Sequence, residues 1–187
     1  GYRMMVWAIV AIGALIFIVW AHHMYVSGMH PYFGFFFATT TLIIAIPTAI
    51  KVYNWVLTLW RGNIHFNVPM LFAIGFIFTF VNGGLTGLFL ATLGLDIHLT
   101  DTYFVVAHFH YIMVGGAIMG YLGGLHFWWP KMFGRMYSEF WSRISAILVF
   151  VGFNLTFFPQ FVLGYMGMPR RYHMYPDEFQ VLNVLSS

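Results

Sequence analysis

The sequence predicts an all-α fold, a polytopic transmembrane bundle of five helices, and two observations lead to that prediction. Of its 187 residues, 61% are hydrophobic and only 7% are charged, whereas soluble proteins average about 45–50% apolar and about 25% charged residues. The apolar residues also gather in long stretches almost free of charge, and only helices satisfy their backbone hydrogen bonds across lipid in stretches of this kind. We therefore expect residues 1–187 to form one transmembrane domain.

Five apolar stretches predict the five helices. Each holds about 18–27 residues, and about 20 residues at a rise of 1.5 Å cross a hydrocarbon core of roughly 30 Å. In chain order the expected spans are residues 4–22, 35–60, 69–92, 103–129 and 144–166.

Basic residues at the ends of the spans predict the orientation. One side carries five cations and a single acid, and the other carries two cations and four acids. Cytoplasmic loops are enriched in Lys and Arg, so we expect the first side to be cytoplasmic. Residues 22–34, 93–102 and 167–187 then share the outer side. The five cytoplasmic cations are Arg3, Arg61, Lys131, Arg135 and Arg143.

The remaining composition excludes several classes of protein. There is no cysteine, which rules out disulfide frameworks, thiolate metal sites and cysteine nucleophiles. Eight basic and five acidic residues are too few and too scattered for a basic face that binds nucleic acid. The chain begins with Gly1 and shows no signal-peptide pattern, and we expect it to be an internal segment of a longer protein.

His22 and His23 are adjacent at the outer end of the first span. Neighbouring residues on a helix diverge by about 100°, so the two imidazoles could reach one metal ion from adjacent corners. The alternative is a pair of interfacial histidines that hydrates the end of the helix. The sequence leaves both interpretations open.

His108 and His110 lie in the outer third of the fourth span. At a spacing of two residues they point about 160° apart on a helix, so they cannot chelate one metal ion. Each can instead offer a ring nitrogen on its own side of the helix. Ionisable residues inside a membrane are generally functional, and axial haem ligation would suit two such rings. The alternative is a pair of buried histidines with satisfied hydrogen bonds.

Lys51 lies inside the second span, three residues after Thr48. Pro47 removes a backbone donor and leaves a carbonyl free in the preceding turn. A lysine at this depth needs water or a polar partner, and the pattern suggests a proton-conducting column entered from the cytoplasm. The alternative is a lysine that extends to the cytoplasmic interface.

Charged residues also gather on the outer side. Arg170 and Arg171 follow the fifth span, and planar guanidinium groups are suited to carboxylates. The carboxylates could be haem propionates or the acids at residues 177–178. Asp96 and Asp101 flank the start of the fourth span, where Asp101 could cap the helix.

Several stretches together resemble subunit I of the haem–copper oxygen reductases, and within that family the cytochrome c oxidases. They follow the family's order along nearly the whole chain. The stretches are Val19-Trp-Ala-His-His-Met24, Ile44-Ile-Ala-Ile-Pro-Thr-Ala-Ile-Lys51, Gly83-Gly-Leu-Thr-Gly87, Asp101-Thr-Tyr-Phe-Val-Val-Ala-His-Phe-His-Tyr111 and Gly167-Met-Pro-Arg-Arg-Tyr172.

The resemblance implies that the chain holds helices seven to eleven of a twelve-helix subunit with two haems, of A type, and copper. It makes His22 and His23 two ligands of the copper ion, His108 the axial ligand of the high-spin haem, and His110 a ligand of the low-spin haem.

The resemblance assigns further roles near these ligands. Arg170, Arg171 and Asp96 would belong to the propionate region, and Lys51 with Thr48 to a proton pathway. Asp101 would belong to a magnesium or manganese site, but Thr100 stands where the family usually has histidine. A hydroxyl is a weaker ligand than imidazole, so we expect weak metal binding there.

The resemblance implies reduction of O₂ to water, coupled to proton pumping, in the bacterial cytoplasmic or mitochondrial inner membrane. Cytochrome c would be the electron donor, and subunits II and III, with the lipid bilayer, would be the partners. A quinol oxidase and, less closely, a nitric oxide reductase are alternatives within the same class. A cation or metal transporter without redox chemistry is the alternative of another class, and its mark would be inverted repeats with paired broken helices.

Overall fold

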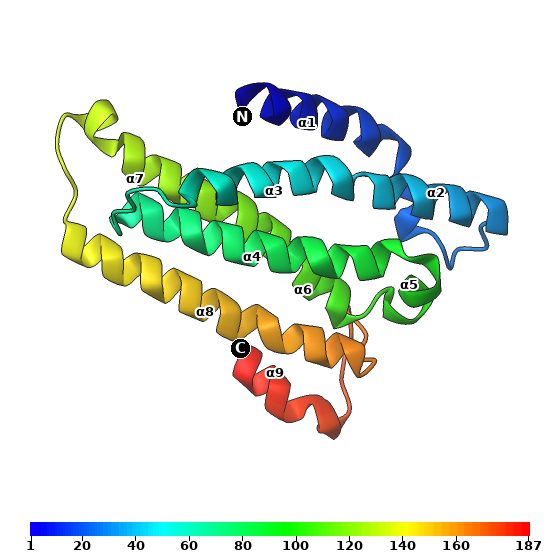
Figure 1. The fold of residues 1–187 in the computed structure, drawn as a ribbon. Coiled ribbons are helices and arrows are strands. Elements are labelled where there is room, and N and C mark those ends of the chain that lie inside the picture. Colours follow the sequence, from blue (N-terminus) through cyan, green and yellow to red (C-terminus); the bar gives the residue numbers. More distant parts are fainter. The chain divides into compact units, whose positions relative to one another are not determined.

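The computed structural model describes all 187 residues, and every regular secondary-structure element in it is a helix (Figure 1). The only β-type contact is an isolated bridge between Thr102 and Pro169. The all-α class predicted from composition is therefore confirmed. The chain forms two compact units, one of residues 1–62 with 84–100 and one of residues 63–83 with 101–187.

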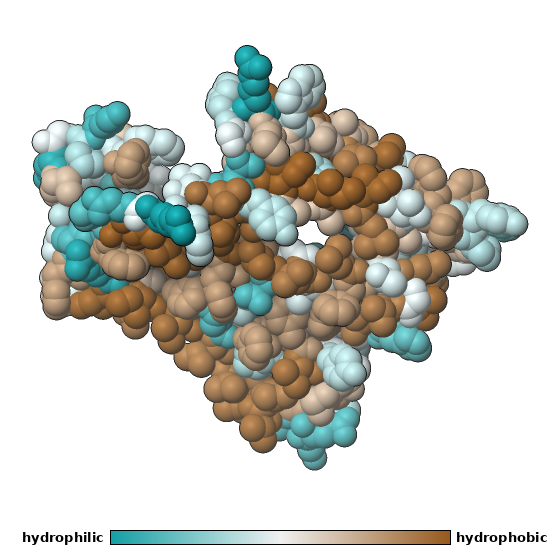
Figure 2. All heavy atoms as spheres, viewed as in Figure 1, coloured by the Kyte–Doolittle hydropathy of each residue, from teal (hydrophilic) through white to brown (hydrophobic).

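Four helices are long and apolar enough to cross a membrane, and they coincide with the last four expected spans, three of which run one residue past the end of the helix. A fifth apolar helix, Tyr2–Ile18, is shorter. Figure 2 shows hydrophobic side chains over much of the visible surface, including the part over α8. The four long helices are Pro31–Leu59, Val68–Ala91, Tyr103–Phe133 and Glu139–Tyr165.

Several helices extend beyond the apolar stretches that predicted them. The second span begins at Pro31 rather than residue 35, because proline suits the first turn of a helix and the His30 ring caps it, accepting from the Tyr32 amide at 3.4 Å. The last span begins at Glu139 rather than residue 144. The apolar stretches therefore located the helices, and these two helices begin four to five residues before the stretches that predicted them.

The first unit contains the helices that precede residue 62, together with α5. Within it, α1 packs along α3, and α2 contacts both η2 and α5. Its buried core consists of Ala21, Tyr25, Phe37 and Ala38. The elements are α1 (Tyr2–Leu15), the 3₁₀ turns η1 (Ile16–Ile18) and η2 (Trp20–His23), α2 (Pro31–Ile43), α3 (Ala45–Leu59) and α5 (Leu93–Leu99).

The long helix Pro31–Leu59 is interrupted at Ile44, between α2 and α3. Pro47 has no amide hydrogen to donate to the preceding turn, and the Thr48 hydroxyl donates to the Ile44 carbonyl at 2.8 Å. The side chain thus supports the backbone at the break.

The second unit is built around α8, which packs along α6 and α9. A short π-helical segment, η3, separates α6 from α7. The elements are α4 (Val68–Ala91) as far as Gly83, α6 (Tyr103–Ile112), η3 (Met113–Ile118), α7 (Met119–Phe133), α8 (Glu139–Tyr165), η4 (Asp177–Phe179) and α9 (Gln180–Ser186).

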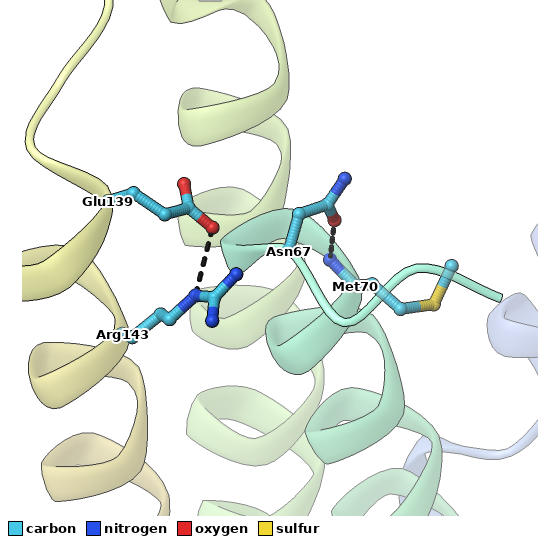
Figure 3. A network of polar contacts seen from close by, with 4 residues as sticks. All are labelled: Asn67, Met70, Glu139 and Arg143. Carbon is cyan, nitrogen blue, oxygen red and sulfur yellow. Dashed lines mark hydrogen bonds and ion pairs between the residues drawn. The ribbon is translucent and has the colours of Figure 1, made fainter.

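Local polar contacts support the ends of these helices (Figure 3). The Asn67 side chain accepts from the Met70 amide at 3.1 Å and so caps the start of α4. At the start of α8, Arg143 Nε lies 3.1 Å from Glu139 Oε1, one turn earlier. Gly134, with φ +66°, ends α7 in the left-handed conformation that glycine favours.

Candidate functional site

His22 and His23 lie on the 3₁₀ turn η2, not at the end of a regular α-helix as the sequence suggested. Their Nε2 atoms are 2.9 Å apart. With metal–nitrogen bonds of about 2.0–2.1 Å, that separation corresponds to two ligands roughly 90° apart on one ion. In the structure the two nitrogens are within hydrogen-bond distance of each other, and two ligands of one ion could have the same separation.

Thr41 orients the first of these rings. His22 Nδ1 is 3.1 Å from Thr41 Oγ1, and that hydroxyl donates its own proton to the Phe37 carbonyl at 2.6 Å. The Thr41 hydroxyl therefore links the His22 ring to the backbone of α2. Metal-binding histidines commonly use their second nitrogen in this way.

His108 is held by the backbone of α4. Its Nδ1 lies 2.9 Å from the Gly83 carbonyl oxygen, which can only accept, so Nδ1 carries the proton and Nε2 the lone pair. A Cβ atom on Gly83 would lie 3.0 Å from Tyr111 Cβ and 2.9 Å from Ile112 Cδ1. Glycine thus permits the close approach that makes this hydrogen bond.

His110 lies against a different helix. Its Nδ1 donates to the Val106 carbonyl at 2.7 Å, and its ring stacks on Phe157 of α8 with centroids 4.1 Å apart at 17°. His108 and His110 thus contact α4 and α8 respectively, which fits the divergence expected from their spacing. Each has its Nδ1 engaged by a backbone carbonyl.

Gln160 has a buried oxygen with no hydrogen-bond partner. The side chain lies on α8, three residues after Phe157, and its Oε1 is the one buried side-chain polar atom left unsatisfied in the protein. An unsatisfied buried acceptor destabilises a fold by about 1–3 kcal/mol. The position therefore calls for a donor from a further group.

Arg170 forms an ion pair with Asp101. Its Nη2 and Nε lie 2.7 and 2.8 Å from Asp101 Oδ1, and its amide donates to the Asp101 carbonyl at 2.9 Å. The alternative of a pair with the acids at residues 177–178 is therefore wrong for Arg170. The bridge between Thr102 and Pro169 joins the segment before Arg170 to the start of α6 instead. The expected cap is also wrong: Thr102, not Asp101, accepts from the Phe104 amide, at 3.3 Å.

Two residues of this region have a left-handed backbone. Asp101 has φ +55° and Arg171 has φ +59°, a conformation that side chains other than glycine rarely adopt. Neither conformation was predictable from the sequence, since neither residue stands in a typical turn motif. Arg171 is exposed and forms neither of the two ion pairs.

Asp96 is 5% exposed on α5, and its charge acts on a tyrosine that sequence reasoning missed. Burial, followed by the charge of Asp96, raises the pKa of Tyr25 to about 12, while a hydrogen bond with Thr41 opposes the change. The Tyr25 hydroxyl donates to the Ala91 carbonyl at 3.4 Å. The only sequence signal was its place two residues after the histidine pair.

Lys51 and Thr48 lie one turn apart on α3. The Lys51 ammonium is 5.5 Å from the centre of the Trp55 ring, and cations are attracted to the face of such rings. Neither ion pair of the protein involves Lys51. The Thr48 hydroxyl is bound to the helix backbone, as described above, so the structure joins neither residue to an acid.

Comparison with known proteins bears on the role of these residues. Residues 1–187 match the family described as "Cytochrome C and Quinol oxidase polypeptide I". The chain is 67% identical over 92% of its length to "Alternative cytochrome c oxidase subunit 1" of Bradyrhizobium diazoefficiens. It is 53% identical over 94% to "Cytochrome c oxidase subunit 1" of Bacillus subtilis, and 50% identical over 100% to the protein so named in Cereibacter sphaeroides.

The chain is shorter than these relatives. The matched regions make up 29%, 28% and 33% of the respective proteins.

Proposed function

Because this membrane protein belongs to the family of cytochrome c and quinol oxidase polypeptide I, we propose that it forms part of the catalytic subunit of a proton-pumping terminal oxidase. The reaction would be the reduction of O₂ to water. The observation that carries the proposal is the pair His108 and His110, which lie on one helix and contact different neighbours with both Nδ1 atoms engaged.

The residues around α6 fit two haems. His108 would hold the high-spin haem and His110 the low-spin haem, each through Nε2, and we expect haems of A type. The orphaned acceptor of Gln160, near the ring that stacks on His110, supports a bound group on that side. When bound, the haems and copper would supply the electron transfer and the reduction of O₂; the chain would orient the ligand rings and exclude water.

His22 and His23 fit two of the copper ligands. The separation of their Nε2 atoms suits a shared ion, and Thr41 holds the His22 ring at Nδ1. No three His, Asp or Glu side chains of this chain form a group that could hold a metal ion. A further ligand would therefore come from outside residues 1–187.

Arg170, Arg171 and Asp96 would form the propionate region. Asp101, the expected magnesium or manganese ligand, has one oxygen engaged twice by Arg170, and Thr100 offers only a hydroxyl. We therefore propose weak metal binding here. Paramagnetic resonance of the intact oxidase should show more bound Mn²⁺ in Thr100→His than in the parent protein, and equal binding would contradict this proposal.

Lys51 and Thr48 would carry protons from the cytoplasmic side. Lys51 is the only Asp, Glu, Lys or Arg residue between residues 4 and 60, and its ammonium lies over Trp55 rather than in an ion pair. A lysine without a carboxylate partner can exchange its proton with water that enters the helix bundle. Beside the break, Pro47 has no amide hydrogen to offer the Ile43 carbonyl, which can then bind such water.

The remaining proposals concern the whole protein. Tyr2–Ile18 would be a fifth span within one transmembrane domain, with subunits II and III and lipid as partners. The relatives' names support cytochrome c as the donor, with quinol the alternative because the family includes both. Their bacterial origin supports the bacterial cytoplasmic membrane over the mitochondrial inner membrane.

A visible spectrum of the intact oxidase tests the proposal. The reduced-minus-oxidised spectrum should show two haem signals, and carbon monoxide should shift only one. His108→Ala should remove the shifted signal and His110→Ala the other. His126→Ala is the matched control, because His126 Nδ1 is bound to the Leu122 carbonyl at 2.7 Å just as His110 is bound to Val106.

The expected control result is an unchanged spectrum in His126→Ala. Absence of haem absorbance from the pure, intact protein would overturn the oxidase proposal. It would leave the cation or metal transporter as the interpretation to test.

A further inference from the structure

We propose that Thr79 is a positioning residue that holds the π-helical segment η3 in place and thereby fixes how α6 presents His108. The inference concerns the second unit alone. It rests on the proposed function only in giving His108 its role as a haem ligand.

The segment η3 follows directly after the helix that carries His108 and His110. In a π-helix the hydrogen bonds join residues five apart, and such wide turns within α-helices are frequent at functional sites. Gly115 lies within this segment. Its carbonyl oxygen is 2.8 Å from the hydroxyl of Thr79 on α4, so a side chain of another helix supports the irregular turn.

The Thr79 hydroxyl has one proton, and its surroundings indicate where that proton is needed. The side chain is 0% exposed, so no water competes for it. Gly75 O, in its own helix, also lies 2.8 Å away, but the amide of residue 79 is the regular helical donor to that carbonyl. The Phe76 carbonyl, at 3.3 Å, is also in the same helix. Of these three carbonyls only that of Gly115 belongs to another helix, so it is the one through which the hydroxyl can join α4 to η3.

The two backbones approach closely at the same place. A Cβ atom on Gly115 would lie 2.7 Å from Thr79 Cβ, a separation that no larger residue could accept without displacing α4. One turn further along α4, Gly83 approaches Tyr111 in the same manner and binds His108 through its carbonyl. Two hydrogen bonds one turn apart on α4 thus fix α6 and η3.

Loss of the hydrogen bond between Thr79 and Gly115 should therefore affect the hydrogen bond between Gly83 and His108. If η3 moves away from Thr79, the contact between Gly83 and α6 loosens, and the Gly83 carbonyl no longer holds the His108 ring at one angle. The ring would keep its ligand nitrogen but lose its fixed orientation. Thr79 thus acts through other residues and touches no reacting atom.

The test compares Thr79→Val, which keeps the shape but removes the hydroxyl, with Thr79→Ser, which keeps the hydroxyl, in the intact oxidase. Resonance Raman spectroscopy of the iron–histidine stretching band reports the bond at His108. Hydrogen exchange of the amides of residues 113–119 reports η3 without requiring haem. Thr39→Val is the control, since the exposed Thr39 hydroxyl bonds only its own helix, to Phe35 at 2.8 Å.

Thr79→Val should shift or broaden the stretching band and speed exchange in η3 by about three- to twentyfold, the range that typical interhelical hydrogen bonds in membranes provide. Thr79→Ser and Thr39→Val should match the parent protein. Parent-like behaviour of Thr79→Val would overturn the proposal. Equal defects in the valine and serine variants would also overturn it, because packing rather than the hydroxyl would then be responsible.

Two further outcomes keep the inference separate from the proposed function. If Thr79→Val does not assemble, Gly115→Ala serves instead. It should separate η3 from Thr79 and shift the iron–histidine band in the same way. An unshifted band in Gly115→Ala would overturn the proposal. If the parent protein has no iron–histidine band at all, the proposed function fails. Exchange in the serine and valine variants then still decides whether Thr79 holds η3.

Discussion

At the scale of single residues, three of the proposed ligand histidines share one hydrogen-bonding arrangement. His22, His108 and His110 each have Nδ1 bound to an oxygen of the protein, at 3.1, 2.9 and 2.7 Å. The acceptors differ, being a threonine hydroxyl, a carbonyl of another helix and a carbonyl of the same helix. The common result is a ring held at Nδ1, so that Nε2 is the nitrogen proposed as the ligand atom.

Lys51 supports a prediction about proton supply. Lys51→Met keeps much of the side chain's volume but removes the only titratable amine of the helix Pro31–Leu59. We expect the reduction of the O₂-binding centre to slow by about tenfold or more, a change of about 1.4 kcal/mol in the barrier. Stopped-flow spectroscopy of the intact oxidase measures this rate.

The control for Lys51→Met is Lys131→Met, since Lys131 is an exposed residue near the end of α7. It should leave the rate within about twofold of the parent value. An unchanged rate in Lys51→Met, with normal haem content, would refute a role for Lys51 in proton uptake.

Tyr25 supports a prediction about alkaline pH. Its pKa is raised from 10.0 to about 12 in the folded protein, so above pH 10 the unfolded chain loses this proton before the folded one does. The tyrosine's contribution to stability is therefore complete below pH 10 and lost between about pH 10 and 12. Tyr25→Phe should lose less stability over this interval, as measured by thermal unfolding at each pH.

The cause of the shift can be tested separately. Asp96→Asn removes the nearby charge and should lower the pKa of Tyr25, seen as earlier phenolate absorbance in an ultraviolet titration. Burial is the larger cause, so the pKa should remain above 10. A Tyr25 that titrates at its ordinary value in the parent protein would contradict the environment described here.

At the scale of helices, the close approach of α8 to α6 has the clearest consequence. A Cβ atom on Gly164 would overlap the backbone nitrogen of Phe104, which cannot move as a flexible side chain could. Gly164→Ala should therefore destabilise the protein by about 1–3 kcal/mol or more, as overpacking does. Thermal unfolding in detergent measures the loss.

Gly152 provides the matched control on the same helix. No atom lies within 4 Å of a Cβ built there, and alanine is favoured over glycine in a helix by about 0.5–1 kcal/mol. Gly152→Ala should thus be neutral or stabilising. Equal unfolding temperatures for the two alanine variants would show that the approach at Gly164 is not as tight as described.

The helices were predictable because lipid requires continuous apolar stretches, and those stretches are long in this chain. The irregular segments were not, because each depends on a partner distant in the sequence. Nothing near Gly115 indicates a π-helix that Thr79 supports, and nothing near Asp101 identifies Arg170 as its partner. His22 and His23 were identified as a pair, but the 3₁₀ turn that brings their Nε2 atoms together was not foreseen.

At the scale of the whole molecule, the positive-inside pattern predicts which loops share a side. The chain has no cysteine, so a single introduced thiol is unique within it. If Tyr2–Ile18 crosses the membrane, Arg3→Cys and Ser27→Cys should react from opposite sides with a membrane-impermeant maleimide. Labelling of intact cells reports the outer side, and labelling of inverted vesicles reports the cytoplasmic side. Any other cysteines of the whole protein are replaced beforehand.

Ser138→Cys, in the exposed turn between α7 and α8, sets the cytoplasmic reference for this labelling. It should react only in inverted vesicles, as Arg3→Cys should. Reaction of residues 3 and 27 from the same side would show that Tyr2–Ile18 does not span the membrane.

The shared helix α4 bears on how the protein is made. The first unit needs residues 84–100 as well as residues 1–62, and the second begins at residue 63, so neither can be finished before α4 leaves the ribosome. At about 5–20 residues per second, residue 100 follows residue 62 after roughly 2–8 s. During that interval the growing chain already contains the histidine pair and Lys51 but not Asp96. Delayed membrane insertion of this single helix would therefore stall the maturation of both halves together.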